Sequence, residues 1–209
     1  MEITKISPQA KNPERINLYV DGKFYRGLDR LVAMKLGLKS GLILNPKLLD
    51  QLETTQSENS AWEWALKSLQ ISPKSKRDMG IRLRRKFEPP LVEAVMERLT
   101  NANLLDDQKL AEQWINRFVL QNTKSRKEIL LKLRQKGIEE SAIKSAAAGI
   151  PDGTIAVLNL AKIKNRSLKR ELSWKERFEK LASYLARKGF SYQEIRQTVT
   201  PTNLEIETD

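Results

Sequence analysis

Pairs and triplets of basic residues recur along the chain from residue 76 onward, and their chemistry is the binding of anions. Guanidinium and ammonium groups pair with phosphates and carboxylates, which favours a polyanion or an acidic protein assembly as the partner. The candidate binding residues are Lys76, Arg77, Arg82, Arg84, Arg85, Arg126, Lys127, Arg134, Lys136, Arg187 and Lys188. For Lys136 and Lys188 the alternative is that they only stabilise the negative end of a helix.

The side chains that most often perform catalysis are missing. The sequence contains no histidine and no cysteine, so the usual general base, the best nucleophile and the commonest zinc ligands are absent. No clustered carboxylates or glycine-rich phosphate loop take their place. We therefore predict a protein that is not an enzyme, with no catalytic residue, no metal site and no cofactor. An enzyme acting on nucleic acid is the least favoured alternative.

The charge is large for 209 residues. The net charge is +12 and the pI is about 9.9, and the basic excess is spread along the whole chain. A charge of this size exceeds what solubility needs, although keeping an exposed helical surface in solution remains the alternative explanation. The polar start, MEITKISPQAKNPER, lacks the apolar core of a signal peptide, and no apolar run is long enough to span a membrane. We expect a cytoplasmic protein without membrane contact.

The basic pairs belong to a stretch that repeats. Residues 61–86 align without a gap on residues 111–136, with seven identities that include Trp64 with Trp114 and Ser75 with Ser125. A looser third copy follows at an offset of 52. A period of about fifty residues is typical of helical units that bury their apolar faces by stacking on one another. Such arrays usually bind extended partners, so a binding protein is favoured over an enzyme.

The elements that position these residues form a mainly α protein. We predict three tandem three-helix repeats, at residues 57–106, 107–152 and 153–202, with equivalent first helices at 61–69, 110–120 and 155–163. A small unit at residues 1–56 precedes them, with a β-hairpin around Asp21-Gly22 and short helices. The polar stretch 53–60 is expected to link this unit to the repeats, and residues 203–209 are expected to form a mobile acidic tail.

The basic pairs mark the two ends of each second helix. Ser75 and Ser125 are suited to cap its start, and Gly137 and Gly189 are suited to end it in the left-handed conformation. The first copy has Phe87 where the other two have glycine, so a distorted turn is expected there. If the repeats stack with a constant rotation, the second helices should line one continuous basic face.

Taken together and in order, several short motifs resemble the RecX family, regulators of the bacterial recombinase RecA. The motifs are Asn12-Pro13-Glu14-Arg15, Tyr19-Val20-Asp21-Gly22-Lys23, Leu36-Gly37-Leu38-Lys39-Ser40-Gly41, Leu104-Leu105-Asp106-Asp107, Ser125-Arg126-Lys127-Glu128-Ile129, Leu133-Arg134-Gln135-Lys136-Gly137-Ile138 and Leu185-Ala186-Arg187-Lys188-Gly189-Phe190-Ser191. The resemblance extends from about residue 3 to residue 199. Two features depart from the family pattern: the missing glycine of the first repeat, and the run Asn103-Leu104-Leu105-Asp106-Asp107, where a Tyr often precedes the Leu-Asp-Asp.

The resemblance implies tandem three-helix repeats and a role in DNA recombination, DNA repair and the SOS response. It implies binding along the RecA–DNA filament and inhibition of RecA ATP hydrolysis and strand exchange. The expected partners are therefore the RecA filament, single-stranded DNA and double-stranded DNA, bound by a monomer. The alternative function is a direct DNA-binding protein that uses the three-helix units in the manner of helix-turn-helix motifs.

Overall fold

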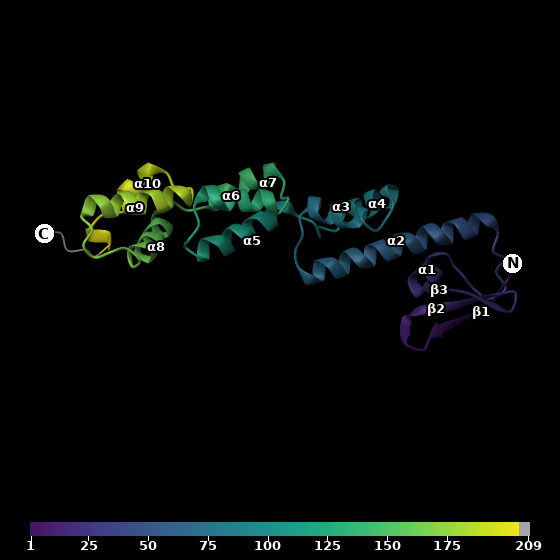
Figure 1. Cartoon of the computed structure of the whole chain (residues 1–209). Coiled ribbons are helices and arrows are strands. Elements are labelled where there is room, and N and C mark those ends of the chain that lie inside the picture. Colours follow the sequence, from purple (N-terminus) through teal and green to yellow (C-terminus); the bar gives the residue numbers. More distant parts are fainter. Residues whose placement is uncertain (205–209) are drawn as a thin grey trace. The chain divides into compact units, whose positions relative to one another are not determined.

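The computed structural model describes residues 1–204, which are mainly helical (Figure 1). The chain divides into two compact units. Unit 1 comprises Met1–Pro73 and Met79–Ala102, and unit 2 comprises Lys74–Asp78 and the chain from Asn103 onward. The helices α2, α3 and α4, then α5, α6 and α7, then α8, α9 and α10 form three successive triplets after a small antiparallel sheet. This confirms the predicted fold class.

Unit 1 begins with a three-stranded antiparallel sheet in the order β1-β2-β3. The strands are β1 (Ile3–Gln9), β2 (Asn12–Val20) and β3 (Lys23–Asp29). Asp21 and Gly22 join β2 to β3 with φ of 48° and 79°, as a two-residue hairpin turn requires. The helices α1 (Arg30–Lys35) and α2 (Pro46–Ile71) lie on the face of the sheet that carries Ile16 and Leu18 (Figure 1).

The predicted linker at residues 53–60 is wrong, because this stretch lies inside the 26-residue helix α2. Two of its polar side chains, Gln56 and Asn59, bond to the sheet unit, while most of the others are exposed. The carboxylate of Asp29 accepts hydrogen bonds from Gln56 Nε2 at 2.6 Å and from Asn59 Nδ2 at 3.1 Å, and Leu52 is fully buried beside them. Helix α2 therefore serves both the sheet and the first repeat.

The first repeat consists of the second half of α2, α3 (Lys76–Arg84) and α4 (Pro89–Asn101), with α2 in contact with α4. Its buried residues include Ala61, Ala65, Leu83 and Leu99. The start of α3, within Lys74–Asp78, belongs to unit 2, and the rest of the helix belongs to unit 1. At its end the Phe87 amide bonds to the Leu83 carbonyl, without the positive φ seen at Gly137 and Gly189. The turn differs from the other two, as expected.

Unit 2 contains the second and third repeats, each around its own core. The second repeat consists of α5 (Asp107–Leu120), α6 (Arg126–Gln135), α7 (Glu140–Ala146) and η1 (Ala147–Gly149). The third consists of α8 (Thr154–Asn165), α9 (Trp174–Arg187), α10 (Tyr192–Thr198) and η2 (Thr202–Leu204). Corresponding residues of the second helices, such as Leu133 and Leu185, are fully buried in the two cores.

The structured part of the chain extends beyond the predicted limit at residue 202. Asn203 and Leu204, which were expected to begin the tail, form η2 instead. Leu204 is buried in the third core, and Asn203 Nδ2 donates to the Thr198 carbonyl at 2.7 Å. The remainder of the predicted tail, residues 205–209, lies outside the described residues. None of the helices within residues 1–204 is long and apolar enough to span a membrane.

Candidate functional site

Several of the predicted basic residues lie at two points where the second helices of consecutive repeats meet. Ser125 caps α6, since its Oγ accepts a hydrogen bond from the Glu128 amide at 3.1 Å. The same hydroxyl donates to the Lys188 carbonyl, at the end of α9, at 2.7 Å. The end of α9 therefore lies against the start of α6.

The start of α3 repeats this arrangement. Ser75 Oγ accepts from the Asp78 amide at 3.1 Å and donates to the Lys136 carbonyl, at the end of α6, at 2.9 Å. Each contact brings the positive start of one helix to the negative end of another, which is the favourable orientation of the helix dipoles. We call these two contacts the α6–α9 junction and the α3–α6 junction.

A glycine allows each junction to close. Gly137 and Gly189 have φ of 74° and 91°. A Cβ atom on Gly189 would come within 2.8 Å of Ser125 Oγ, and one on Gly137 within 3.2 Å of Ser75 Oγ. Glycine is required at both places for its backbone conformation and for the space that the serine occupies.

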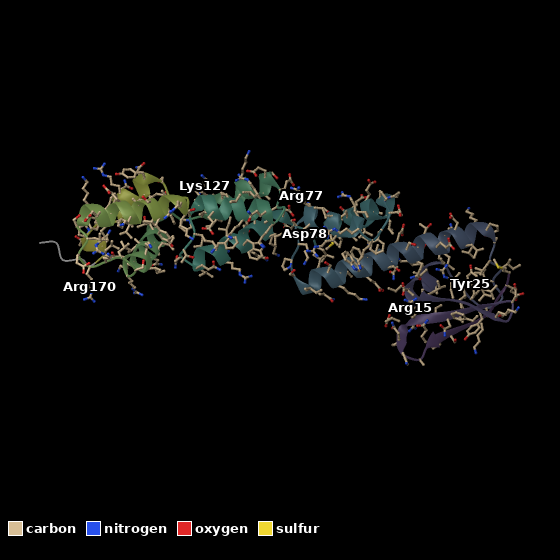
Figure 2. The ribbon with its side chains drawn as sticks, in the orientation of Figure 1. Arg15, Tyr25, Arg77, Asp78, Lys127 and Arg170 are labelled. Carbon is tan, nitrogen blue, oxygen red and sulfur yellow. The ribbon has the colours of Figure 1, made fainter. Side chains whose placement is uncertain are left out.

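Arg77 and Lys127 occupy equivalent positions at the two junctions (Figure 2). The Cβ and Cδ of Arg77 lie 3.4 Å from the Cβ position of Gly137, and those of Lys127 lie 3.4 and 3.6 Å from that of Gly189. Both residues are exposed, so the stems cover the glycines while the charged groups remain accessible to solvent. Each junction thus presents a basic group from the same structural position.

Asp107, from the Leu-Leu-Asp-Asp motif, fixes the α3–α6 junction. It is buried, and its two carboxylate oxygens accept from the backbone amides of Lys76 at 2.9 Å and Glu139 at 2.8 Å. Those amides belong to the starts of α3 and α7. Its neighbour Asp106 caps α5 by accepting from the Lys109 amide at 3.0 Å.

Two of the predicted residues lie against aromatic rings. Lys136 Nζ lies 3.5 Å from the centre of the Trp114 ring, and burial, followed by the charges of Arg117 and Lys132, lowers the pKa of this amine. Lys188 Nζ lies 5.8 Å from the centre of the Tyr184 ring. These lysines stabilise the ends of α6 and α9 through aromatic rings.

In the first repeat, Lys86 Nζ lies 5.2 Å from the ring centre of Trp64, which is half-buried like Trp114. The two tryptophans therefore occupy equivalent environments, as the fifty-residue alignment predicts.

Arg134 is engaged in an ion pair. Its Nε and Nη2 donate to the two carboxylate oxygens of Glu140 at 2.9 and 2.7 Å. The hydrogen bond with Arg134 lowers the pKa of Glu140, and the same hydrogen bond raises the pKa of Arg134. Both groups are at the surface, so the pair orients α7 against α6 more than it adds stability.

The remaining candidates divide between the two units. Arg82, Arg84 and Arg85 are exposed on unit 1, where the Arg84 guanidinium lies about 3.6 Å from the Cβ position of Gly80. Arg126 and Arg187 are exposed on unit 2, and Arg126 Nη1 is 3.5 Å from the Ile150 carbonyl. Within unit 2 the structure brings together Lys76, Arg77, Arg134 and Lys136 at one junction, and Lys127 and Lys188 at the other.

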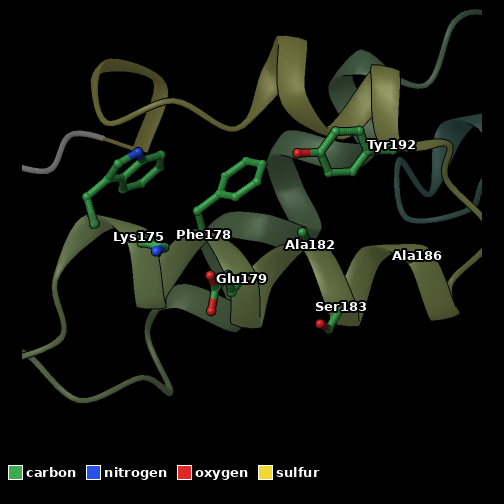
Figure 3. Close-up of a pocket in the computed structure, with 8 residues that line it drawn as sticks. Lys175, Phe178, Glu179, Ala182, Ser183, Ala186 and Tyr192 are labelled. Atoms are coloured by element: carbon green, nitrogen blue, oxygen red, sulfur yellow. The ribbon is translucent and has the colours of Figure 1, made fainter.

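An apolar groove on the third repeat was not predicted from the sequence (Figure 3). The groove has a volume of about 590 Å³ and is lined by α9 and the start of α10. The Trp174 and Phe178 ring centres are 6.0 Å apart, and those of Phe178 and Tyr192 are 6.5 Å apart. With the 52-residue offset, Phe178 and Tyr192 stand where the second repeat has Arg126 and Glu140. Extending the alignment over α9 would have revealed this exchange.

Comparison with known proteins supports the architecture over both ends of the chain. Residues 1–45 match the regulatory protein RecX N-terminal domain, and residues 156–199 match the third three-helix domain of RecX. A crystal structure of a regulatory protein RecX, 26% identical, superposes with a TM-score of 0.78 over 94% of this chain and 98% of that chain. A crystal structure of RecX from Lactobacillus salivarius, 23% identical, shares the fold with a TM-score of 0.62 over 71% and 97% of the two chains.

Two curated relatives cover nearly the whole chain. Regulatory protein RecX of Clostridioides difficile is 29% identical over 199 residues, which make up 94% of this chain and 93% of the relative. Regulatory protein RecX of Bacillus subtilis is 30% identical over 211 residues, which make up 99% of this chain and 79% of the relative. The chain therefore belongs to the RecX family of regulatory proteins.

Proposed function

We propose that this protein is a non-enzymatic modulator of RecA that binds along the RecA–DNA filament and reduces ATP hydrolysis and strand exchange. Membership of a family of regulatory proteins supports a binding function. The absence of histidine and cysteine from the sequence agrees with a protein that acts by contact and not by chemistry.

The observation that carries the proposal is the equivalence of Arg77 and Lys127. Each follows the serine of a second helix by two residues, covers the glycine of the next second helix and leaves its charge exposed. A repeated partner, such as a filament with its regularly spaced phosphates and protomers, is matched by a binding group that itself repeats. These two residues are therefore the first candidates for contact with the filament.

The other predicted residues differ in how free their charges are to contact the filament. Arg84, Arg85, Arg126 and Arg187 are exposed and add basic groups at or next to the second helix of their own repeats. Arg134 and Lys136 contribute positive charge near Arg77, but Glu140 and the Trp114 ring already engage them.

Tandem repeats suit this role because several weak contacts act together. When one repeat is bound, the next binds its protomer at a high effective concentration, so the whole chain binds more tightly than any single unit. A protein bound across neighbouring protomers restricts their relative movement and occupies space that an incoming duplex needs. Both effects would slow ATP hydrolysis and strand exchange.

The test is RecA ATP hydrolysis on single-stranded DNA, together with strand exchange, with and without this protein. We expect sub-stoichiometric protein to lower both rates. The double variant Arg77→Glu/Lys127→Glu should inhibit less, and Arg77→Gln/Lys127→Gln should lie between it and the unmodified protein. The matched control is Lys67→Glu/Lys144→Glu, which makes the same charge change at exposed positions outside the second helices and should inhibit normally.

Two results would count against the proposal. Unchanged RecA rates at equimolar protein over a range of salt would remove the inhibitory function. Tight binding to naked duplex DNA with a steep salt dependence, and no preference for the filament, would favour the direct DNA-binding alternative.

A further inference from the structure

The N-terminal sheet has an outward face that α1 and α2 do not cover. Side chains alternate between the two faces of a strand, so Ile16, Leu18 and Val20 of β2 point into the core while Asn17 and Tyr19 point the other way. The strand register places Lys5 of β1 and Phe24 of β3 on either side of Tyr19. The helices of unit 1 that contact the sheet lie on the core side (Figure 1).

Two aromatic rings form the centre of this outward face. The Tyr19 and Phe24 ring centres are 5.8 Å apart with an interplanar angle of 77°, so one ring presents its edge to the other. The Phe24 side chain is 60% exposed, which leaves a broad apolar surface in contact with water. Lys5 Nζ lies 5.6 Å from the centre of the Tyr19 ring on the neighbouring strand.

Next to the rings lies a row of amide groups. Gln9 Nε2 donates to Asn17 Oδ1 at 2.9 Å, and a Cβ on Gly27 would come within 2.7 Å of Gln9 Nε2. The Arg15 guanidinium reaches the Gly27 carbonyl at 3.4 Å. Because position 27 has no side chain, the amides lie close to the sheet beside the rings and offer both donors and acceptors.

The charge of the face is positive. Lys5 and Arg15 stand at its two ends, and the register positions between them carry no carboxylate. Asp29 is the register partner of Arg15 and lies 3.9 Å from its guanidinium, but it is buried under α2, where Gln56 and Asn59 donate to it. The exposed Phe24 ring and the half-buried Tyr19 ring beside it, flanked by cations, suit a ligand that combines flat apolar faces with a negatively charged backbone.

We propose that this outward face, made of Lys5, Arg15, Asn17, Tyr19 and Phe24, binds single-stranded nucleic acid by stacking unpaired bases on its rings. Bases within a duplex are already stacked and present only their edges, so exposed rings on a flat sheet select unpaired strands. The cations at the ends would pair with the phosphates, and the amides would reach the base edges. This site is separate from the basic second helices, and it does not depend on any action on RecA.

The experiment uses the full chain and a dye-labelled oligodeoxythymidine of about 16 nucleotides, with an abasic strand of the same length as the second probe. We expect the unmodified protein to bind the thymidine strand more tightly. Phe24→Ala and Tyr19→Leu should each weaken that binding about 5- to 100-fold and leave binding to the abasic strand unchanged. Charge reversal at Arg77 and Lys127 should instead weaken binding to both strands alike.

Further variants separate stacking from loss of structure. Phe24→Tyr keeps an aromatic ring and should bind as the unmodified protein does. Met34→Ala removes an apolar side chain that is 68% exposed on α1 and should have no effect. Equal affinity for the thymidine and abasic strands, or normal thymidine binding by a folded Phe24→Ala protein, would overturn the proposal. The proposal would also be overturned if the Phe24→Ala protein bound the RecA filament more weakly but bound the single strand normally, because the outward face would then contact protein.

Discussion

Gly137 and Gly189 explain why two second helices end in glycine and one does not. Both lie at junctions where a serine from the preceding repeat approaches closely, and both have positive φ. No repeat precedes the first, so the end of α3 receives no serine. Phe87 occupies that place instead, with its ring centre 6.2 Å from that of Trp64. The missing glycine is therefore a property of the terminal position in the array.

At the residue scale, alanine should be costly at the junction glycines and harmless at Gly149. Positive φ alone costs alanine about 1–3 kcal/mol. The closer approach to serine, 2.8 Å against 3.2 Å, should make Gly189→Ala more destabilising than Gly137→Ala. The measurement is the urea midpoint of unfolding. Gly149→Ala is the control, because its Cβ would meet nothing within 4 Å, and it should leave stability unchanged or raise it by up to about 1 kcal/mol. Equal effects at all three positions would contradict this account of the junctions.

At the scale of elements, local signals predicted the helix ends well. Ser125 caps α6 and Gly137 ends it because these preferences depend on neighbouring backbone groups alone. The continuity of α2 through residues 53–60 was not predicted, because two polar side chains of this stretch, those of Gln56 and Asn59, bond to Asp29, about thirty residues away. Helix propensity and the local pattern of polar and apolar residues carry no information about a partner so far away in the sequence.

The candidate site was predicted only in part, again because contacts between distant residues cannot be read from local sequence. The positions of Arg77 and Lys127 follow from the repeat, but the closeness of their stems to glycines of the next repeat does not. Nor did the sequence show that Arg134 pairs with Glu140 or that Lys136 lies on the Trp114 ring. Basic residues look alike in a sequence, and only their surroundings separate those with structural contacts from those with exposed charge.

The α6–α9 junction predicts an energetic coupling between its two helices. Ser125→Ala removes the cap of α6 and the bond to the Lys188 carbonyl, and should cost about 1–3 kcal/mol of unfolding free energy. Ser173→Ala, which removes a capping box on the exposed start of α9, should cost only about 1 kcal/mol.

A double-mutant cycle with Gly189→Ala provides the sharper check on this coupling. Ser125→Ala removes the oxygen that the new methyl group would meet, so the two changes together should cost less than the sum of their separate effects. Strict additivity would mean that Ser125 and Gly189 do not meet in solution.

At the scale of the whole molecule, the basic surface is distributed over both units. Unit 1 carries Arg84 and Arg85, and unit 2 carries Arg77, Lys127 and Arg187. A distributed surface of this kind is suited to a long partner, because each repeat adds a modest contact and the contacts reinforce one another. Preference for the assembled filament over its separate components is the expected consequence.

The most direct test of the central claim compares the affinity of this protein for RecA–single-stranded DNA filaments and for the same naked strand, across a series of salt concentrations. We predict tighter binding to the filament. Arg77→Gln/Lys127→Gln should weaken filament binding and lower the slope of log affinity against log salt by about 0.7–0.9 for each lost phosphate contact. Lys67→Gln/Lys144→Gln should leave both unchanged. Equal affinity for filament and naked strand, or normal filament binding by a folded Arg77→Gln/Lys127→Gln protein, would contradict the claim that repeated basic junctions recognise the filament.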